Sequence, residues 1–486
     1  MLTLIVFLPL VGAAVCALLP SNNPQWARWV AAAFSAVDLA LVVWLVLHFV
    51  PGGGRQFAEN FAWVPSAQIN YSLSVDGLSL PLLFLSALLT FLAVLASWKI
   101  DKKPAFYFSM MLLLQVGMNG VFLAMDFVLF YVFWELVLVP MYFLIAQWGG
   151  PRREYAAMKF FLYTLFGSVF MLVGIVMLFL NTGTFDMVEL TTRWATLLPA
   201  GLQWWLFLLF FLGFAVKVPI WPLHTWLPDA HVEAPTAASA LLAGVLLKMG
   251  VYGFLRVSLP MLPNAFHQWQ WFLAVLAMIS IVYGAAVAFA QTDIKKLVAY
   301  SSVSHMGFAM LGIASGTAVG IGGAMAVSFS HGLIAGMLFL MVGQVYDRAH
   351  TREISQLSGL AGQMPVIAGL LAFASIASMG LPGLSGFIGE FMSLVGAWQS
   401  PDIARWIVFA ASMGVLLGAA YMLWMMQRVV LGQPSYIIAD CPDASIREVV
   451  VVAPLVVLIV AIGVNWELLL RYIDPAARLI AKTLGA

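Results

Sequence analysis

Charge is what this sequence lacks most. Only 9% of the 486 residues are Asp, Glu, Lys or Arg, whereas soluble domains carry about 25%. The net charge is +1 and no basic tract is longer than a pair such as Lys102-Lys103, which excludes a nucleic-acid partner. Hydrophobic residues make up 63% of the chain. The composition therefore predicts a protein that lies in a membrane, in contact with lipids.

Cysteines and nucleotide-binding motifs are also scarce. The two cysteines, Cys16 and Cys441, are far apart and form no C-x-x-C motif, so we expect neither a disulfide nor a zinc or iron–sulfur site. Gly320 and Gly322 fall inside an apolar run that does not complete a dinucleotide fingerprint, and no Walker motif is present. We therefore expect no cofactor in this chain.

One loop combines two histidines with two carboxylates, at His224, Asp229, His231 and Glu233. Their spacing does not match H-E-x-x-H or a similar metal-binding pattern. We do not expect a metal site here. Capping of the following helix by Asp229 or Glu233 is the simpler interpretation.

What the sequence does contain is a series of apolar runs of about 20 residues, the length that spans a bilayer as a helix. They indicate an all-α polytopic membrane protein with a single domain and no soluble domain in its loops. We place about fourteen spanning helices, at residues 2–19, 28–50, 78–98, 105–125, 127–147, 158–181, 204–224, 235–259, 270–290, 297–315, 318–343, 365–395, 405–428 and 448–469.

The loops differ in positive charge. Loops after odd-numbered helices carry thirteen Lys and Arg residues, and those on the other side, with the C-terminal tail, carry seven. Cytoplasmic loops are the ones enriched in positive charge. We therefore predict a multi-pass protein of the bacterial inner membrane with both termini on the periplasmic side.

Polar residues recur at a similar spacing in the two halves. Glu135 and Lys217 are 82 residues apart, and His305 and Glu390 are 85 apart. The spacing suggests two five-helix repeats, which an odd helix number makes inverted in the membrane. The corresponding parts are helices 1–3 (1–104), the first repeat (105–260), the second repeat (261–432), and helix 14 with the C-terminal tail (433–486).

The seventh predicted helix should break beside Lys217. Pro219 and Pro222 follow that lysine directly, and each proline removes a backbone donor and clashes with the preceding turn. Non-helical backbone at membrane depth is tolerated where it lines a wet cavity or is buried in protein. We expect local hydration next to Lys217.

The twelfth predicted helix should break beside Glu390. Gly380, Pro382 and Gly383 precede this glutamate in a glycine-rich segment. Both breaks therefore lie next to an ionisable residue, which is typical of discontinuous helices at transport sites.

Four charged residues lie near the middle of apolar helices: Glu135, Lys217, Lys248 and Glu390. A charge at the bilayer centre costs about 2.5 to 3.5 kcal/mol even on a lenient scale, so such residues are usually functional. Their alternating sign indicates a charge or proton pathway, with Lys217 as the expected partner of Glu135. The competing interpretations are a structural ion pair for Glu135 and snorkelling for Lys248.

Two helical histidines, His305 and His331, have serines nearby, including Ser301 and Ser328. Histidine titrates near neutral pH, and the hydroxyl groups can hold water, so we interpret the pair as a proton relay. A satisfied core histidine is the alternative. Asp38 has no visible partner, and we interpret it as structural or snorkelled.

Three stretches, Phe130 to Ile145, Phe214 to Pro235 and Ser301 to Gly307, resemble the antiporter-like subunits of respiratory complex I, and the resemblance covers nearly the whole chain. Within that group the chain is most similar to the subunit M family, counterpart of mitochondrial NADH dehydrogenase subunit 4. Glu390 in Gly386-Phe-Ile-Gly-Glu390-Phe favours that family, as does the lack of a long extension after the last helix.

The resemblance implies a proton-translocating subunit of the membrane arm of NADH:quinone oxidoreductase, with neighbouring antiporter-like subunits as partners. FMN, iron–sulfur clusters and quinone would belong to partner subunits. It also implies Glu135 and Lys217 as a coupled pair, Lys248 as the central relay, and His305, His331 and Glu390 as the route onward. Alternatives are a subunit of a multisubunit cation/proton antiporter or membrane-bound hydrogenase, or a passive structural scaffold.

Overall fold

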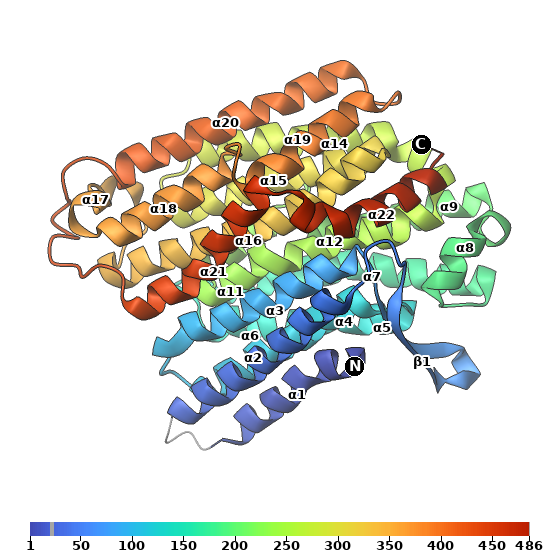
Figure 1. Ribbon diagram of the computed structural model, residues 1–486, viewed down its shortest axis with the longest axis horizontal. Helices are drawn as coiled ribbons and strands as arrows, with labels where there is room; N and C mark the ends of the chain where they lie inside the picture. Colours follow the sequence, from blue (N-terminus) through green and yellow to red (C-terminus); the bar gives the residue numbers. More distant parts are fainter. Residues whose placement is uncertain (20–23, 486) are drawn as a thin grey trace.

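The computed structural model describes residues 1–19 and 24–485. Its helices run roughly parallel or antiparallel in one long bundle, with both chain ends toward the same end of it (Figure 1). The helices are α1 Leu2–Leu18, α2 Pro24–His48, α3 Ser79–Ala96, α4 Pro104–Leu123, α5 Phe127–Leu136, α6 Leu138–Trp148, α7 Arg153–Thr182, α8 Met187–Leu197, α9 Ala200–Lys217, α10 Trp226–Glu233, α11 Thr236–Leu241, α12 Leu247–Gly253, α13 Leu259–Met261, α14 Pro263–Phe289, α15 Ile294–Ser315, α16 Ala318–Ala349, α17 Leu360–Gln363, α18 Pro365–Ser378, α19 Ser385–Gln399, α20 Arg405–Val429, α21 Ile446–Val464 and α22 Glu467–Thr483.

The remaining elements are short. Two strands, β1 Gln56–Val64 and β2 Ile69–Val75, pair as an antiparallel hairpin. The π-helical turns η3 Leu242–Leu246 and η4 Phe254–Ser258 lie on either side of α12. The 3-10 turns are η1 Pro65–Ala67, η2 Ser97–Lys99 and η5 Ile354–Gln356.

Within the described residues, twelve helices are long and apolar enough to cross a membrane. The predicted membrane class is therefore confirmed, whereas the count of fourteen is not. The difference arises at two places. The first predicted span is the short helix α1, and the predicted helix 365–395 is divided into α18 and α19.

Both predicted helix breaks are present. The helix α9 ends at Lys217, and residues 218–225 form turns that contain Pro219 and Pro222 before α10 begins. The exposed backbone groups of the break find partners, since the Trp221 amide donates to Ser280 Oγ at 2.9 Å and the Trp226 indole donates to the Val216 carbonyl at 3.0 Å.

The second break separates α18 from α19. Gly380 and Gly383 have φ angles of +74° and +94°, a conformation that glycine adopts without steric cost. Pro382 lies between them and supplies no backbone donor. The break follows Ser378, so Glu390 is several residues inside α19 in sequence, although its side chain turns back toward Gly380.

Two segments that sequence patterns predicted as loop or tail are ordered structure. Residues 51–77 contain the β hairpin, and the tail of 433–486 contains the helix α22. The hairpin projects beside the N-terminus, and α22 lies across other helices of the bundle (Figure 1). The segment between α7 and α9 likewise contains α8, which we had not predicted.

Candidate functional site

Lys248 lies at the centre of the described ionisable residues. Its side chain is fully buried on α12, directly after the π-helical turn η3. Its ammonium donates to the carbonyl of Ala243 within that turn and shares a hydrogen bond of 2.7 Å with His331 Nδ1. π-helical turns shift the backbone hydrogen bonds and often mark functional sites. The turn provides Lys248 with an acceptor from its own helix.

A second linked set continues from His331 to the break between α18 and α19. The rings of His331 and His305 are 5.5 Å apart between centroids. His305 Nδ1 donates to Glu390 Oε1 at 2.6 Å, and its Nε2 lies 3.1 Å from Ser378 Oγ, at the last residue of α18. Four of the predicted site residues therefore form one contiguous chain.

Glu390 reaches the broken backbone. A Cβ atom placed on Gly380 would lie 3.2 Å from Glu390 Oε2. The carboxylate therefore sits against the non-helical segment. A cavity of about 20 Å³ is lined by Ser301, Ser330, His305, His331, Ser378 and Glu390, among others. That volume suffices for a single water molecule, and its polar lining supplies hydrogen-bond partners for one.

Glu135 and Lys217 are close enough to interact electrostatically, but no ion pair within 4.0 Å joins them among the described residues. The Lys217 ammonium lies 5.4 Å from the Trp134 ring centre instead. Neither Lys217 Nζ nor Glu135 Oε1 has a hydrogen-bond partner within the described part of the chain. We call this arrangement an open pair, because the two charged groups interact at a distance while the Trp134 ring lies beside the ammonium.

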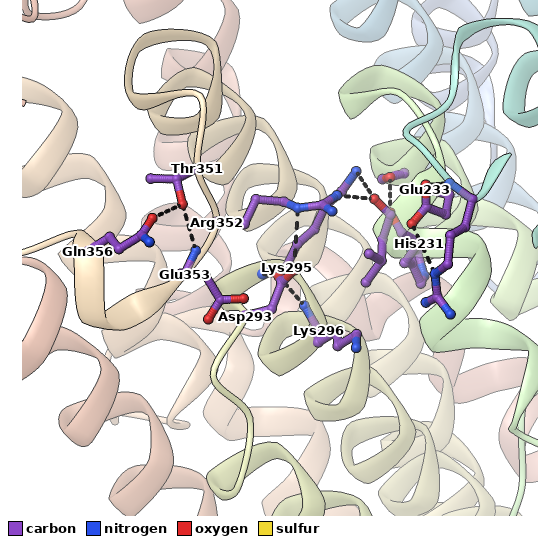
Figure 2. Close-up of polar contacts among 12 residues, drawn as sticks. His231, Glu233, Asp293, Lys295, Lys296, Thr351, Arg352, Glu353 and Gln356 are labelled. Carbon is purple, nitrogen blue, oxygen red and sulfur yellow. Dashed lines mark hydrogen bonds and ion pairs between the residues drawn. The ribbon is translucent and has the colours of Figure 1, made fainter. Parts of the chain in front are cut away.

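One end of α10 is surrounded by charged residues from distant segments. Lys295 donates to the Ala234 carbonyl at 2.6 Å, and Arg352 donates to the Val232 carbonyl at 2.5 Å while lying 3.3 Å from Asp293. Figure 2 shows Arg352 between Asp293 and the end of α10. Cations are stabilised by the carbonyls at a helix C-terminus. These contacts hold the segment after the first break.

This charged end borders a large cavity. Its volume is about 480 Å³, and its lining includes Glu233, Lys295, Asp347, Arg352 and Glu448. All five belong to the loops and helix ends for which the positive-charge count predicts a cytoplasmic location. His231 lies next to this wall, stacked on Phe339 at 4.5 Å.

Glu233 and Asp229 do not cap the following helix, so that prediction is wrong. Among the described residues α11 has no side-chain cap. Glu233 instead accepts from the Arg152 amide at 3.0 Å, at the start of α7, and Asp229 accepts from Lys159 at 2.7 Å. Both carboxylates therefore tie α10 to α7. No cluster of metal-ligating side chains occurs in residues 1–19 and 24–485.

Asp38 is not snorkelled. It is fully buried in α2 and accepts from Gln115 at 2.7 Å and Asn119 at 3.1 Å, both on α4. The interpretation of Asp38 as a structural residue fits these contacts, because the two amides connect the peripheral helix α2 to the bundle.

Several residues of the site were not predicted. Trp134 beside Lys217, Ser378 beside His305, and the Ala243 carbonyl beside Lys248 all belong to it. Trp134 and Ser378 carry no signal of their own in an aromatic-rich, serine-containing membrane chain. The π-helical turn has no sequence signature either.

Two family descriptions match the chain. "NADH:quinone oxidoreductase/Mrp antiporter, TM" matches residues 124–418, and "NADH-ubiquinone oxidoreductase chain 4, amino terminus" matches residues 1–125. NADH-quinone oxidoreductase subunit M of Rhodobacter capsulatus is 44% identical, covering 98% of this chain and 95% of the relative. The chain belongs to the subunit M/chain 4 family of NADH-quinone oxidoreductase. Subunit M of Rickettsia bellii is 40% identical over 95% of this chain and 94% of its own length.

Members of this family are antiporter-like subunits of the membrane arm of complex I, and the solved structures agree. A chain of respiratory complex I from Thermus thermophilus with bound NADH superposes with a TM-score of 0.91 at 34% identity, with 100% of both chains covered. A chain of the Mrp complex from Dietzia shares the fold, with a TM-score of 0.88 at 22% identity and coverage of 100% and 99%.

Proposed function

We propose that this subunit conducts protons through the buried axis of Glu135, Lys217, Lys248, His331, His305 and Glu390, driven by redox chemistry in partner subunits. The observation that carries the proposal is the contiguous chain from Lys248 through His331 and His305 to Glu390. Each of its residues can gain and lose a proton. The chain ends beside a broken helix, and non-helical backbone at membrane depth is tolerated where it lines a wet cavity or is buried in protein.

The open Glu135–Lys217 pair would control when Lys217 releases its proton. A buried ammonium is stabilised by a nearby carboxylate and destabilised when the two separate. Closing the pair would hold a proton on Lys217, and opening it would favour release toward Lys248. Moving one charge across 100 mV takes about 2.3 kcal/mol, which is comparable with what a broken intramembrane ion pair can supply.

The electron carriers are proposed to lie elsewhere in the complex. FMN, iron–sulfur clusters and quinone would be held by partner subunits, and this chain would have no redox site of its own. The bilayer would be the bacterial inner membrane, with both termini on the periplasmic side, because the loops opposite to the termini carry the excess of Lys and Arg.

The test is Lys217→Ala in the intact complex, with NADH oxidation and proton uptake measured together in membrane vesicles. We expect pumping to fall, with or without a fall in electron transfer, because the variant removes the switch without touching a redox centre. Lys482→Ala, on α22, is the matched control and should leave both rates unchanged. If Lys217→Ala matches wild type in both rates, the proposal is overturned.

The same preparation separates the alternatives. A passive scaffold would tolerate neutralisation of Lys217 and Lys248 as long as the complex assembles. A subunit of a multisubunit cation/proton antiporter or membrane-bound hydrogenase would purify without flavin-dependent NADH oxidation. Loss of pumping in a complex that still assembles and oxidises NADH fits only the proposed role.

A further inference from the structure

A ladder of polar side chains continues from Lys248 toward the other end of the same helix. Tyr252 and Arg256 follow Lys248 at intervals of four residues, so Arg256 lies about 12 Å further along at 1.5 Å per residue. The Tyr252 hydroxyl donates to the Phe122 carbonyl at 2.9 Å and accepts from Arg256 Nε at 3.0 Å. This ladder is distinct from the route through His331.

The ladder ends in a buried ion pair. An Arg256 guanidinium nitrogen donates to Asp76 Oδ1 at 2.6 Å, and both side chains are largely buried, with Arg256 8% and Asp76 9% exposed. The same Asp76 oxygen accepts from the amides of Leu78 and Ser79 at 3.0 and 3.1 Å, at the start of α3. The ion pair therefore connects the start of α3 with η4, and Tyr252 connects α12 with the end of α4.

The helix α22 covers the Asp76–Arg256 ion pair. A Cβ atom on Gly77, next to Asp76, would lie 2.0 Å from the Tyr472 carbonyl, so α22 packs directly against this turn. A second cation, Arg55, lies within electrostatic range of Arg256, Asp76 and Asp186. The turn after β2, the end of α4 and the end of η4 all belong to the face predicted to be periplasmic.

We propose that Asp76, Arg256 and Tyr252 seal the periplasmic end of the first half of the subunit, with the fixed positive charge of Arg256 as the barrier to protons. The inference rests on the proton route proposed above. An arginine cannot lose its proton in a protein, and a fixed cation in a narrow path repels protons and other cations. Protons that reach Lys248 are then directed onward to His331.

Two side chains hold Arg256 in position. The Tyr252 hydroxyl and the Asp76 carboxylate fix the guanidinium in place, which makes both of them positioning residues. Because the charge itself is the barrier, removal of Asp76 or Tyr252 with the cation kept should have little effect on the leak, whereas loss of the cation should raise it. A purely structural ion pair would respond equally to loss of either partner.

The experiment measures passive proton leak in liposomes that contain the intact complex without NADH. An imposed pH gradient is followed by an internal pH dye, and assembly is verified by the NADH oxidation rate. We expect Arg256→Gln to raise the leak several-fold, Arg256→Lys and Asp76→Asn to stay as tight as wild type, and the double variant Asp76→Asn/Arg256→Gln to leak like Arg256→Gln alone. Arg405→Gln, an exposed arginine stacked over Trp398, is the matched control.

Three results would overturn the seal. The first is an assembled Arg256→Gln complex that remains tight, and the second is an Arg256→Lys complex that leaks as much as Arg256→Gln. The third is a double variant that is tight again, which would assign the effect to packing of the ion pair. If Arg256→Gln does not assemble, Arg256→His replaces it. Histidine has an ordinary pKa of about 6.5, so the seal predicts a low leak below this pH and a higher leak above it, and a leak independent of pH rejects it.

The outcome is separable from that of the proposed function. The leak is measured without turnover, whereas Lys217→Ala is scored during turnover. A leaky Arg256→Gln with normal pumping in Lys217→Ala would keep the barrier and reject the relay. A tight Arg256→Gln with lost pumping in Lys217→Ala would do the reverse.

Discussion

Asp38 shows how a buried carboxyl group can be structural at the residue scale. Its Oδ2 accepts from Gln115 and Asn119, while its Oδ1 and Gln115 Oε1 both lack a partner within the described part of the chain. No cation contacts the carboxyl group among the described residues. We predict that Oδ1 carries a proton, so that Asp38 connects α2 to α4 as a neutral acid through the Gln115 and Asn119 amides.

This interpretation predicts that Asp38→Asn is nearly silent. The asparagine amide can replace the Oδ1 proton as donor and keep the acceptor for Gln115 and Asn119, so we expect stability within about 1 kcal/mol of wild type. Asp38→Leu leaves two buried amides without an acceptor and should cost about 1 to 3 kcal/mol for each.

The apparent melting temperature of the complex in nanodiscs distinguishes the two substitutions. An equal loss for Asp38→Asn and Asp38→Leu would show that the carboxyl group is ionised in the folded protein. Pumping should be unchanged in Asp38→Asn, since the residue lies outside the proposed axis.

At the residue scale, sequence reasoning found the ionisable groups but not all of their partners. Lys248 and His331 are 83 positions apart, and nothing local in either segment specifies that the two side chains meet. Glu135 and Lys217 were predicted as coupled partners, and the structure adds Trp134 beside the ammonium, which the sequence did not indicate. The cost of burying charge identified the candidate residues, whereas tertiary packing decides which of them are in contact.

At the element scale, the glycines of the second break carry the geometry. Gly383 has a φ of +94°, and a Cβ added there would meet nothing within 4 Å. The cost of Gly383→Ala therefore comes from the backbone alone, about 1 to 2 kcal/mol for a left-handed residue. Strain at this turn would shift Glu390 relative to His305.

We expect Gly383→Ala to lower both the melting temperature and the protons pumped per NADH oxidised. Gly369→Ala is the matched control, because Gly369 lies inside α18 and also has no atom within 4 Å of an added Cβ. A helical glycine replaced by alanine should gain up to about 1 kcal/mol. If Gly383→Ala behaves like Gly369→Ala, the break does not depend on the left-handed turn.

Elements were predictable where the signal is local and missed where it is not. Apolar length revealed the spans, and Pro219 and Gly380 revealed the breaks, because proline and glycine act on their own backbone. The β hairpin and α22 were missed, because a search for uniformly apolar length does not detect an amphipathic helix such as α22. The division into two inverted repeats rests on spacing and stays a prediction.

At the scale of the whole molecule, carboxylates outside the spanning helices set how stability responds to acid. Burial would raise the pKa of Asp76, but the charge of Arg256 and the hydrogen bonds from Arg256, Ser79 and Leu78 hold it below the ordinary value. Burial raises the pKa of Asp126, which caps α5 through the amides of Val128 and Leu129. The two groups therefore act in opposite directions.

These shifts predict opposite pH slopes for two matched variants. Asp76 has a lowered pKa in the folded protein, so its contribution is present above the unfolded value of about 3.9 and is lost as pH falls through the folded value. Asp126 has a raised pKa, so its contribution is complete below the unfolded value and is lost as pH rises through the folded value. The wild type should therefore lose its advantage over Asp76→Asn in acid and gain relative to Asp126→Asn.

Melting temperatures of the complex in nanodiscs between neutral pH and about pH 3, below the unfolded value, provide the measurement. Asparagine keeps one acceptor for the α5 cap and loses the acceptor of the Asn70 amide. That loss does not change with pH, so the slope still reports the charge. Parallel curves for wild type and Asp76→Asn throughout the range would mean that Asp76 is not held ionised by Arg256. The ion pair beneath α22 would then not hold α3 against η4 by charge, whereas the proposed seal, which depends on the Arg256 cation alone, would be unaffected.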